Sequence, residues 1–98
     1  MLIIKLTQVC IMALLLVTYQ LNSDLDQESD FVEAIEYYEH TKLNETAYVI
    51  ETKEKPQTVF QELTRFLERN HTLVIFKIKP PWHGRGHMDM IDWVSEKI

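Results

Sequence analysis

The residues best suited to chemistry lie close together near the carboxyl end of the chain. His83 and His87 stand four positions apart, and Asp89 and Asp92 follow closely. Imidazole and carboxylate groups are common ligands of transition metals, so this spacing could hold a metal ion. The segment also contains two glycines and no cysteine, which fits a turn whose polar side chains face water. We favour the turn, because histidines in a loop supply no fixed ligand geometry, and we expect no metal.

A second group of residues could contact nucleic acid. Lys77, Lys79, His83 and Arg85 could form a local basic patch, with Trp82 beside them to stack on a base. Alternatively, the two lysines alternate with apolar neighbours and keep their charges in solvent on an edge strand. The formal net charge of −5 favours this alternative, because phosphate binding draws on Lys and Arg. We expect Trp82 to pack rather than to bind a ligand.

Other catalytic signals are missing from the sequence. It contains no recognisable pair of nucleophile and base, and no glycine-rich phosphate loop follows an expected strand. His40 and His71 are expected at helix ends, where an imidazole can meet the last carbonyls. A structural role at helix ends therefore accounts for these two histidines, and no catalytic role is needed.

Length and composition limit the class of protein. The 98 residues make one domain (1–98), and 46% hydrophobic with 26% charged residues excludes a wholly disordered chain. A core this small would gain buried surface from dimerisation. The single cysteine, Cys10, forms no intramolecular disulfide, so nothing indicates an oxidising compartment, and we expect a cytoplasmic protein without a membrane partner.

The element that must position any site is the apolar run 13–21. It contains β-branched and aromatic residues and is followed by the turn pair Asn22-Ser23, which is typical of a buried strand. Its unbroken apolarity predicts a central place in a sheet. Its carboxyl end, Tyr19-Gln20, is where such a sheet would present chemistry.

The rest of the chain alternates between helical and strand patterns. We predict helices at 27–40 and from 56 to about 70, strands at 41–43, 46–52 and 73–78, and a short terminal helix around 90–94. This order predicts an α+β, ferredoxin-like βαββαβ sandwich: a four-stranded antiparallel sheet with two helices on one face. The other face would stay open and form a natural dimer surface.

The first residues permit more than one interpretation. Lys5 and the apolar stretch 9–17 resemble parts of a secretory signal, but no small-residue cleavage site follows and removal would delete the best strand. Alternatively, Met12 is the natural first residue, and 1–11 is a dispensable extension or prolongs the strand.

Several segments together carry a family resemblance. The first strand ends in Tyr-x-Leu, and Trp82-x-Gly84 and Trp93-Val94 lie near the terminus. Between them come Phe-Val-Glu-Ala-Ile at 31–35, Lys-Leu-Asn-Glu-Thr-Ala-Tyr-Val-Ile at 42–50 and Leu-Glu-Arg-Asn-His-Thr-Leu-Val-Ile-Phe at 67–76. In these motifs the chain, from residue 12 onwards, resembles the SinR-like proteins, which belong with the Cas-two-like superfamily of small CRISPR-associated proteins.

The resemblance implies a ferredoxin-like homodimer. CRISPR members of that superfamily form the dimeric core on which an integrase assembles with DNA, and some are described as metal-dependent nucleases that use an Asp at the end of the first strand. Here Gln20, directly after Tyr19, stands at that position. A neutral amide lacks the negative charge that a hard divalent cation requires of its ligand. Tyr19 and Gln20 therefore mark a degenerate metal site.

Three functions follow as expectations. The first is a catalytically inactive, dimeric binding or scaffolding protein linked to CRISPR, phage defence or a mobile element, with nucleic acid or a defence-system protein as partner. The second is a metal-dependent endonuclease acting on RNA or DNA, the one case that calls for Mg²⁺. The third is a protein-binding inhibitor or regulator that uses an acidic surface on a basic partner.

Overall fold

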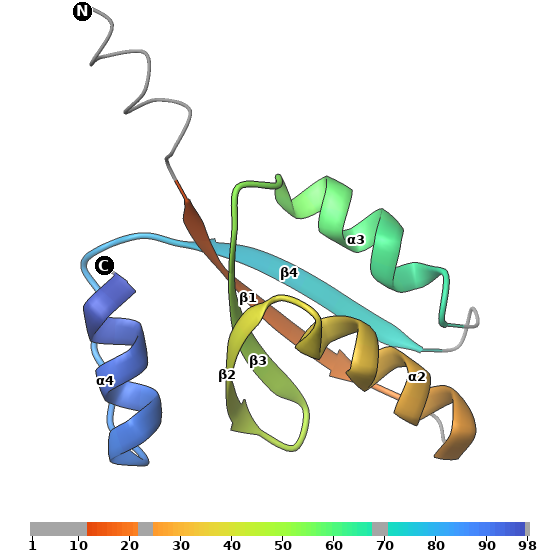
Figure 1. Cartoon of the computed structure of the whole chain (residues 1–98), viewed down its shortest axis with the longest axis horizontal. Helices are drawn as coiled ribbons and strands as arrows, with labels where there is room; N and C mark the ends of the chain where they lie inside the picture. Colours follow the sequence, from red (N-terminus) through yellow and green to blue (C-terminus); the bar gives the residue numbers. More distant parts are fainter. Residues whose placement is uncertain (1–11, 22–24, 68–70, 98) are drawn as a thin grey trace, which may run out of the picture.

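The computed structural model describes residues 12–21, 25–67 and 71–97 of the chain (Figure 1). In chain order its elements are β1 (Ala13–Gln20), α2 (Leu25–Glu36), β2 (Glu39–Asn44), β3 (Ala47–Thr52), α3 (Pro56–Thr64), β4 (Thr72–Ile78) and α4 (Met88–Lys97). The predicted order of strands and helices is confirmed. The alternatives for 1–11 concern residues that lie outside the described ranges.

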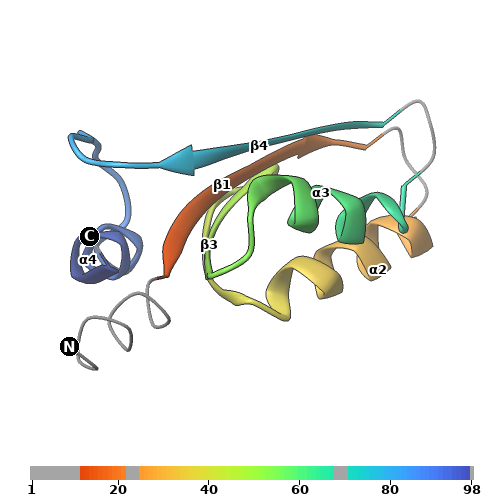
Figure 2. The ribbon, with the colours of Figure 1, turned by 90° about the horizontal axis from the view of Figure 1, so that it is seen from above.

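The four strands form one antiparallel sheet in the order β2-β3-β1-β4. The central strand is β1, as its unbroken apolarity predicts, with Val17 opposite Tyr48 of β3 and Ile75 of β4. Helices α2 and α3 lie side by side across one face of this sheet (Figure 2). The predicted class, an α+β ferredoxin-like fold with two helices on one face and a C-terminal helix, is confirmed.

The main core lies between the sheet and these two helices. Alternate residues of a strand point to opposite faces, so Leu15, Val17 and Tyr19 share the face that α2 and α3 cover. Phe31 of α2 and Val59 of α3 pack into the same buried cluster. The three- and four-residue spacing of apolar side chains in each helix places them on its inner side.

A second, smaller core joins α4 to the other face of the sheet. Leu14 of β1, Val49 of β3 and Val94 of α4 are buried together, and Trp93 packs against them. At the end of α4, Nζ of Lys97 lies 3.2 Å from a carboxylate oxygen of the half-buried Glu51. Because α4 covers this end of the second face, the open part of the sheet is smaller than the sequence suggests.

Two helices are shorter than predicted. Helix α2 ends at Glu36 and not at His40, which lies instead in β2 opposite Ile50. The placement of His40 at a helix end is therefore wrong, although its Nδ1 does lie 2.8 Å from the carbonyl oxygen of Tyr38. Helix α3 ends at Thr64, and the chain continues in tight turns in which Phe66 N–H donates to the carbonyl of Leu63. His71 directly precedes β4.

The remaining boundaries are close to the prediction. Strand β2 is longer than 41–43 and α4 is longer than 90–94, whereas β3 and β4 differ by one residue each. The chain turns tightly between β2 and β3, where the Asn44 side chain accepts a hydrogen bond from Thr46 N–H at 2.9 Å. Within residues 12–21, 25–67 and 71–97, no helix combines the length and apolarity needed to cross a membrane.

Candidate binding surfaces

The end of β1 holds the two residues predicted to mark a degenerate metal site. Tyr19 is buried on the helix-covered face, where its ring meets that of Phe31 edge-on at 4.8 Å and its hydroxyl donates to the carbonyl of Glu45 at 3.2 Å. Burial is the main cause that raises the pKa of Tyr19. Gln20 is exposed on the opposite face, beside Thr72 of β4. Tyr19 thus has a structural role.

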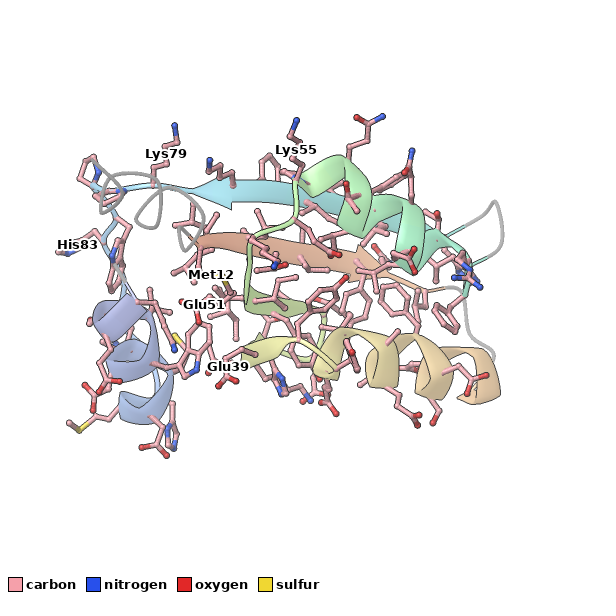
Figure 3. All side chains as sticks on the ribbon, turned by 45° about the horizontal axis from the view of Figure 1, so that its top comes forward. Met12, Glu39, Glu51, Lys55, Lys79 and His83 are labelled. Atoms are coloured by element: carbon pink, nitrogen blue, oxygen red, sulfur yellow. The ribbon has the colours of Figure 1, made fainter. Side chains whose placement is uncertain are left out.

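The histidines of the loop before α4 do not converge on a common point. Nδ1 of His87 lies 3.9 Å from a carboxylate oxygen of Asp89, and both side chains are exposed. His83 is also exposed and points away from the body of the molecule (Figure 3). In the described part of the chain, no three His, Cys, Asp or Glu side chains are grouped as a metal site would require.

The five candidate nucleic-acid contacts are only partly brought together. Trp82, His83 and Arg85 line a hollow of about 360 Å³ beside Ile78. Lys77 lies on the other face of the sheet, since it is opposite Leu15, and the side chain of Lys79 extends away from the molecule (Figure 3).

Trp82 is half-buried against the second core. Its ring also lies 3.6 Å from where a Cβ on Gly84 would stand. Trp82 packs as expected, and whether it also contacts a ligand stays a prediction.

The part of the second sheet face that α4 leaves uncovered forms an uncharged surface, the neutral sheet patch. Its members come from neighbouring positions of two adjacent strands and are Thr18, Gln20, Thr72, Val74 and Phe76. Val74 is 40% exposed and Phe76 is 55% exposed. Because β4 is an edge strand, the patch reaches the border of the sheet. The patch therefore places two exposed apolar side chains next to each other on one strand, with no charged residue among its members.

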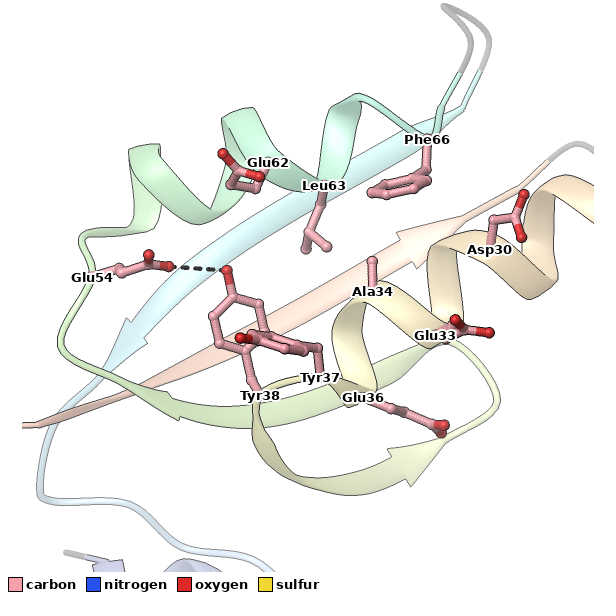
Figure 4. Close-up of a pocket in the computed structure, with 10 residues that line it drawn as sticks. All are labelled: Asp30, Glu33, Ala34, Glu36, Tyr37, Tyr38, Glu54, Glu62, Leu63 and Phe66. Carbon is pink, nitrogen blue, oxygen red and sulfur yellow. Dashed lines mark hydrogen bonds between the residues drawn. The ribbon is translucent and has the colours of Figure 1, made fainter.

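A groove of about 640 Å³ runs along the two helices on the opposite side of the molecule (Figure 4). Ala34 of α2 and Leu63 of α3 form its apolar part, and Phe66, which follows α3, adds a ring that is 37% exposed. Tyr37 and Tyr38, from the turn after α2, stand at one end with ring centroids 6.1 Å apart. We call this feature the helix groove.

Within residues 12–21, 25–67 and 71–97, all charged side chains that line the helix groove are acidic. They come from both helices and from the segment before α3, and they are Asp30, Glu33, Glu36, Glu54 and Glu62. Among the described residues, Glu62 alone of these makes an ion pair, with Arg65 at 3.3 Å. The groove therefore presents an unbalanced negative charge around an apolar and aromatic surface.

Two tyrosine–carboxylate hydrogen bonds fix parts of this groove. The Tyr38 hydroxyl donates to Glu54 at 2.9 Å, and the Tyr48 hydroxyl, from β3, donates to Glu36 at 2.7 Å. Burial, and then the hydrogen bond to the carboxylate, raise the pKa of each tyrosine well above its ordinary value. The two hydroxyls are held in the neutral, donating form, so Glu36 and Glu54 keep fixed positions.

The helix groove was missed by reasoning from the sequence. One signal was present, because Asp30, Glu33 and Tyr37 are spaced three and four apart, which is the spacing of side chains on one side of a helix. The other wall comes from α3, more than twenty residues further along the chain, and local spacing does not show that the two meet. The neutral sheet patch was anticipated only as an open sheet face.

The fold and these surfaces define a class, a ferredoxin-like α+β domain with an uncharged sheet patch on one side and an acidic groove on the other. The comparison with known proteins goes no further: no protein-family model matches the chain, and no curated protein matches it.

Proposed function

We propose that the protein is a binding or scaffolding module that acts as a homodimer through the neutral sheet patch. The observation that carries the proposal is the exposure of Val74 and Phe76 side by side with three uncharged polar residues. In a two-fold interface the same surface meets itself. An uncharged patch can do so without like-charge repulsion, whereas the acidic remainder of the molecule opposes random association.

The proposal assigns no catalytic step to the end of β1. Gln20 offers a neutral amide, and its neighbours in the patch are hydroxyl and apolar side chains. None of these carries the negative charge that would hold a divalent cation against a phosphodiester. The resemblance to Cas-two-like proteins, which pair as dimers, agrees with a scaffold whose setting is CRISPR, phage defence or a mobile element.

We favour a protein as the partner of this scaffold over nucleic acid. Trp82 is packed, Lys77 lies on the opposite sheet face from the hollow lined by His83 and Arg85, and the chain carries a formal net charge of −5. A nucleic-acid site draws its affinity from clustered Lys and Arg. An acidic surface instead complements a basic protein. A cytoplasmic location accords with both kinds of partner.

Sedimentation at tens of micromolar protein tests the dimer. The unmodified chain should sediment as a dimer, and Phe76→Lys should sediment as a monomer, because the two-fold axis would bring two added charges close together. Phe60→Lys is the matched control, since Phe60 is 42% exposed and lies on α3, away from the patch. A monomeric unmodified chain, or equal dissociation by both variants, would contradict the proposal.

A further inference from the structure

The helix groove has the form of a docking site for an elongated side chain or peptide. Its volume of about 640 Å³ lies within the range of ordinary ligand sites, and it is open along the two helices. Ala34 and the partly exposed ring of Phe66 can accept an apolar side chain. Tyr37, which is 88% exposed, contributes a ring that the fold itself leaves almost uncovered.

The charge of the groove restricts what can occupy it. Among the residues that the structure describes, Asp30, Glu33 and Glu54 line it without an ion-pair partner, and no Lys, Arg or His belongs to its lining. Carboxylates and tyrosine rings together suit a guanidinium or ammonium group, which can pair with the former and stack on the latter. An anionic or purely apolar occupant would leave these carboxylates desolvated without compensation.

We propose that the helix groove binds a basic segment of a partner protein, with arginine or lysine side chains against Tyr37, Asp30 and Glu33 and an apolar side chain against Ala34 and Phe66. A small organic cation would meet the acidic groups but leave the apolar part exposed. The combination of both surfaces in one groove therefore favours a peptide segment. The proposed dimer would present two such grooves, but the groove itself lies within one chain.

The probe is a short fluorescein-labelled peptide that alternates arginine with leucine, measured by fluorescence anisotropy at physiological salt. A second peptide replaces each arginine with glutamate, a third replaces each leucine with serine, and spermine serves as the small cation. We expect binding of the first peptide, no binding of the second, and about tenfold weaker binding of the third, because it lacks the apolar contact. Spermine should compete poorly.

Charge-reversal variants locate the binding. Asp30→Lys combined with Glu33→Lys should weaken the arginine–leucine peptide by about tenfold or more. The matched control combines Asp92→Lys with Glu96→Lys, which changes the net charge equally on exposed positions of α4. Phe66→Ser should also weaken binding, whereas Phe60→Ser should not. Circular dichroism checks that each variant folds. Changes in the NMR chemical shifts of backbone amides, when the arginine–leucine peptide is added to the unmodified chain, locate the binding site directly.

Several results would overturn the proposal. Equal losses in the two double reversals would show attraction to overall charge, and spermine binding as tightly as the peptide would show a small-cation site. Shifts centred on the hollow near Trp82, or no peptide binding by the folded protein, would also refute it. None of these results depends on the oligomeric state, so failure of the groove and failure of the dimer are distinguishable.

Discussion

Tyr48 joins the main core to the surface of the molecule through one side-chain hydrogen bond. Its ring is fully buried, whereas its hydroxyl reaches Glu36, an exposed carboxylate at the end of α2. The contact ties β3 to α2 without burying a charge. Tyr38 makes the equivalent link to Glu54 before α3. Both links require a protonated tyrosine, so they are sensitive to alkaline pH.

We expect the free energy of unfolding to fall as pH rises above about 10, the ordinary pKa of tyrosine. The pKa values of Tyr38 and Tyr48 are raised in the folded state, so their contribution is complete below about pH 10 and is lost as pH rises towards the folded pKa. Urea unfolding at neutral and alkaline pH measures this. Tyr48→Phe should cost about 1 kcal/mol at neutral pH and should flatten the alkaline decline.

Tyr37→Phe is the control for that experiment, because Tyr37 is exposed and its hydroxyl has no hydrogen-bond partner among the described residues. This variant should leave unchanged both the free energy of unfolding at neutral pH and its decline at alkaline pH. An alkaline slope that is the same in Tyr48→Phe as in the unmodified chain would show that other groups cause the decline.

Strand alternation makes some residue-scale features predictable from sequence. Neighbours such as Tyr19 and Gln20 must point to opposite faces, so one is buried and the other exposed once the strand is known. The partners of Tyr48 and Tyr38 could not be predicted in this way. Each hydrogen bond joins groups that are more than ten residues apart, and only the packed fold brings them together.

At the scale of elements, sequence periodicity located each helix but not always its end. The helical spacing of Phe31, Ala34, Ile35 and Tyr38 predicts a helix through residue 38, yet α2 ends at Glu36. Tyr38 still packs against the main core from outside the helix. A residue beyond the end of a helix can thus be buried at the position that the helical spacing predicts. The apolar pattern alone does not distinguish such a residue from one inside the helix.

Helix α4 illustrates what periodicity leaves open. The apolar positions Met90, Trp93 and Val94 predict a helix with one apolar side, and the structure shows that side against Leu14 and Val49. A pattern defines which side of a helix is buried, but not which surface covers it. The sequence therefore suggested an open second face where α4 covers part of it.

We expect Val94→Ala to lower the free energy of unfolding by roughly 2 kcal/mol, because two buried methyl groups are removed. Hydrogen exchange should show the loss concentrated in α4 and the neighbouring end of the sheet, since Val94 belongs to the smaller core. Ser95→Ala, at the next and exposed position, should change stability by less than about 0.5 kcal/mol. Equal destabilisation of the α2–α3 side would show that the two cores form one cooperative unit.

At the scale of the whole molecule, the sheet separates two surfaces of different chemistry. The neutral sheet patch lies on one face of the sheet. The helix groove is lined mostly by residues of α2 and α3, and these two helices cover the other face (Figure 2). The main core, which includes Leu15, Val17 and Ile50, fills the space between sheet and helices. A dimer formed through the patch would leave both grooves exposed on its outer sides.

This separation predicts that dimerisation and peptide binding are independent. The two sites share no residue, and substitutions without shared contacts add in free energy. Phe76→Lys should therefore abolish the dimer but keep the affinity for the arginine–leucine peptide. Asp30→Lys combined with Glu33→Lys should keep the dimer but weaken peptide binding. Titration calorimetry should give one peptide per chain in both the dimer and the monomeric variant. A changed stoichiometry, or loss of peptide affinity in Phe76→Lys, would instead place part of the binding surface across the dimer interface.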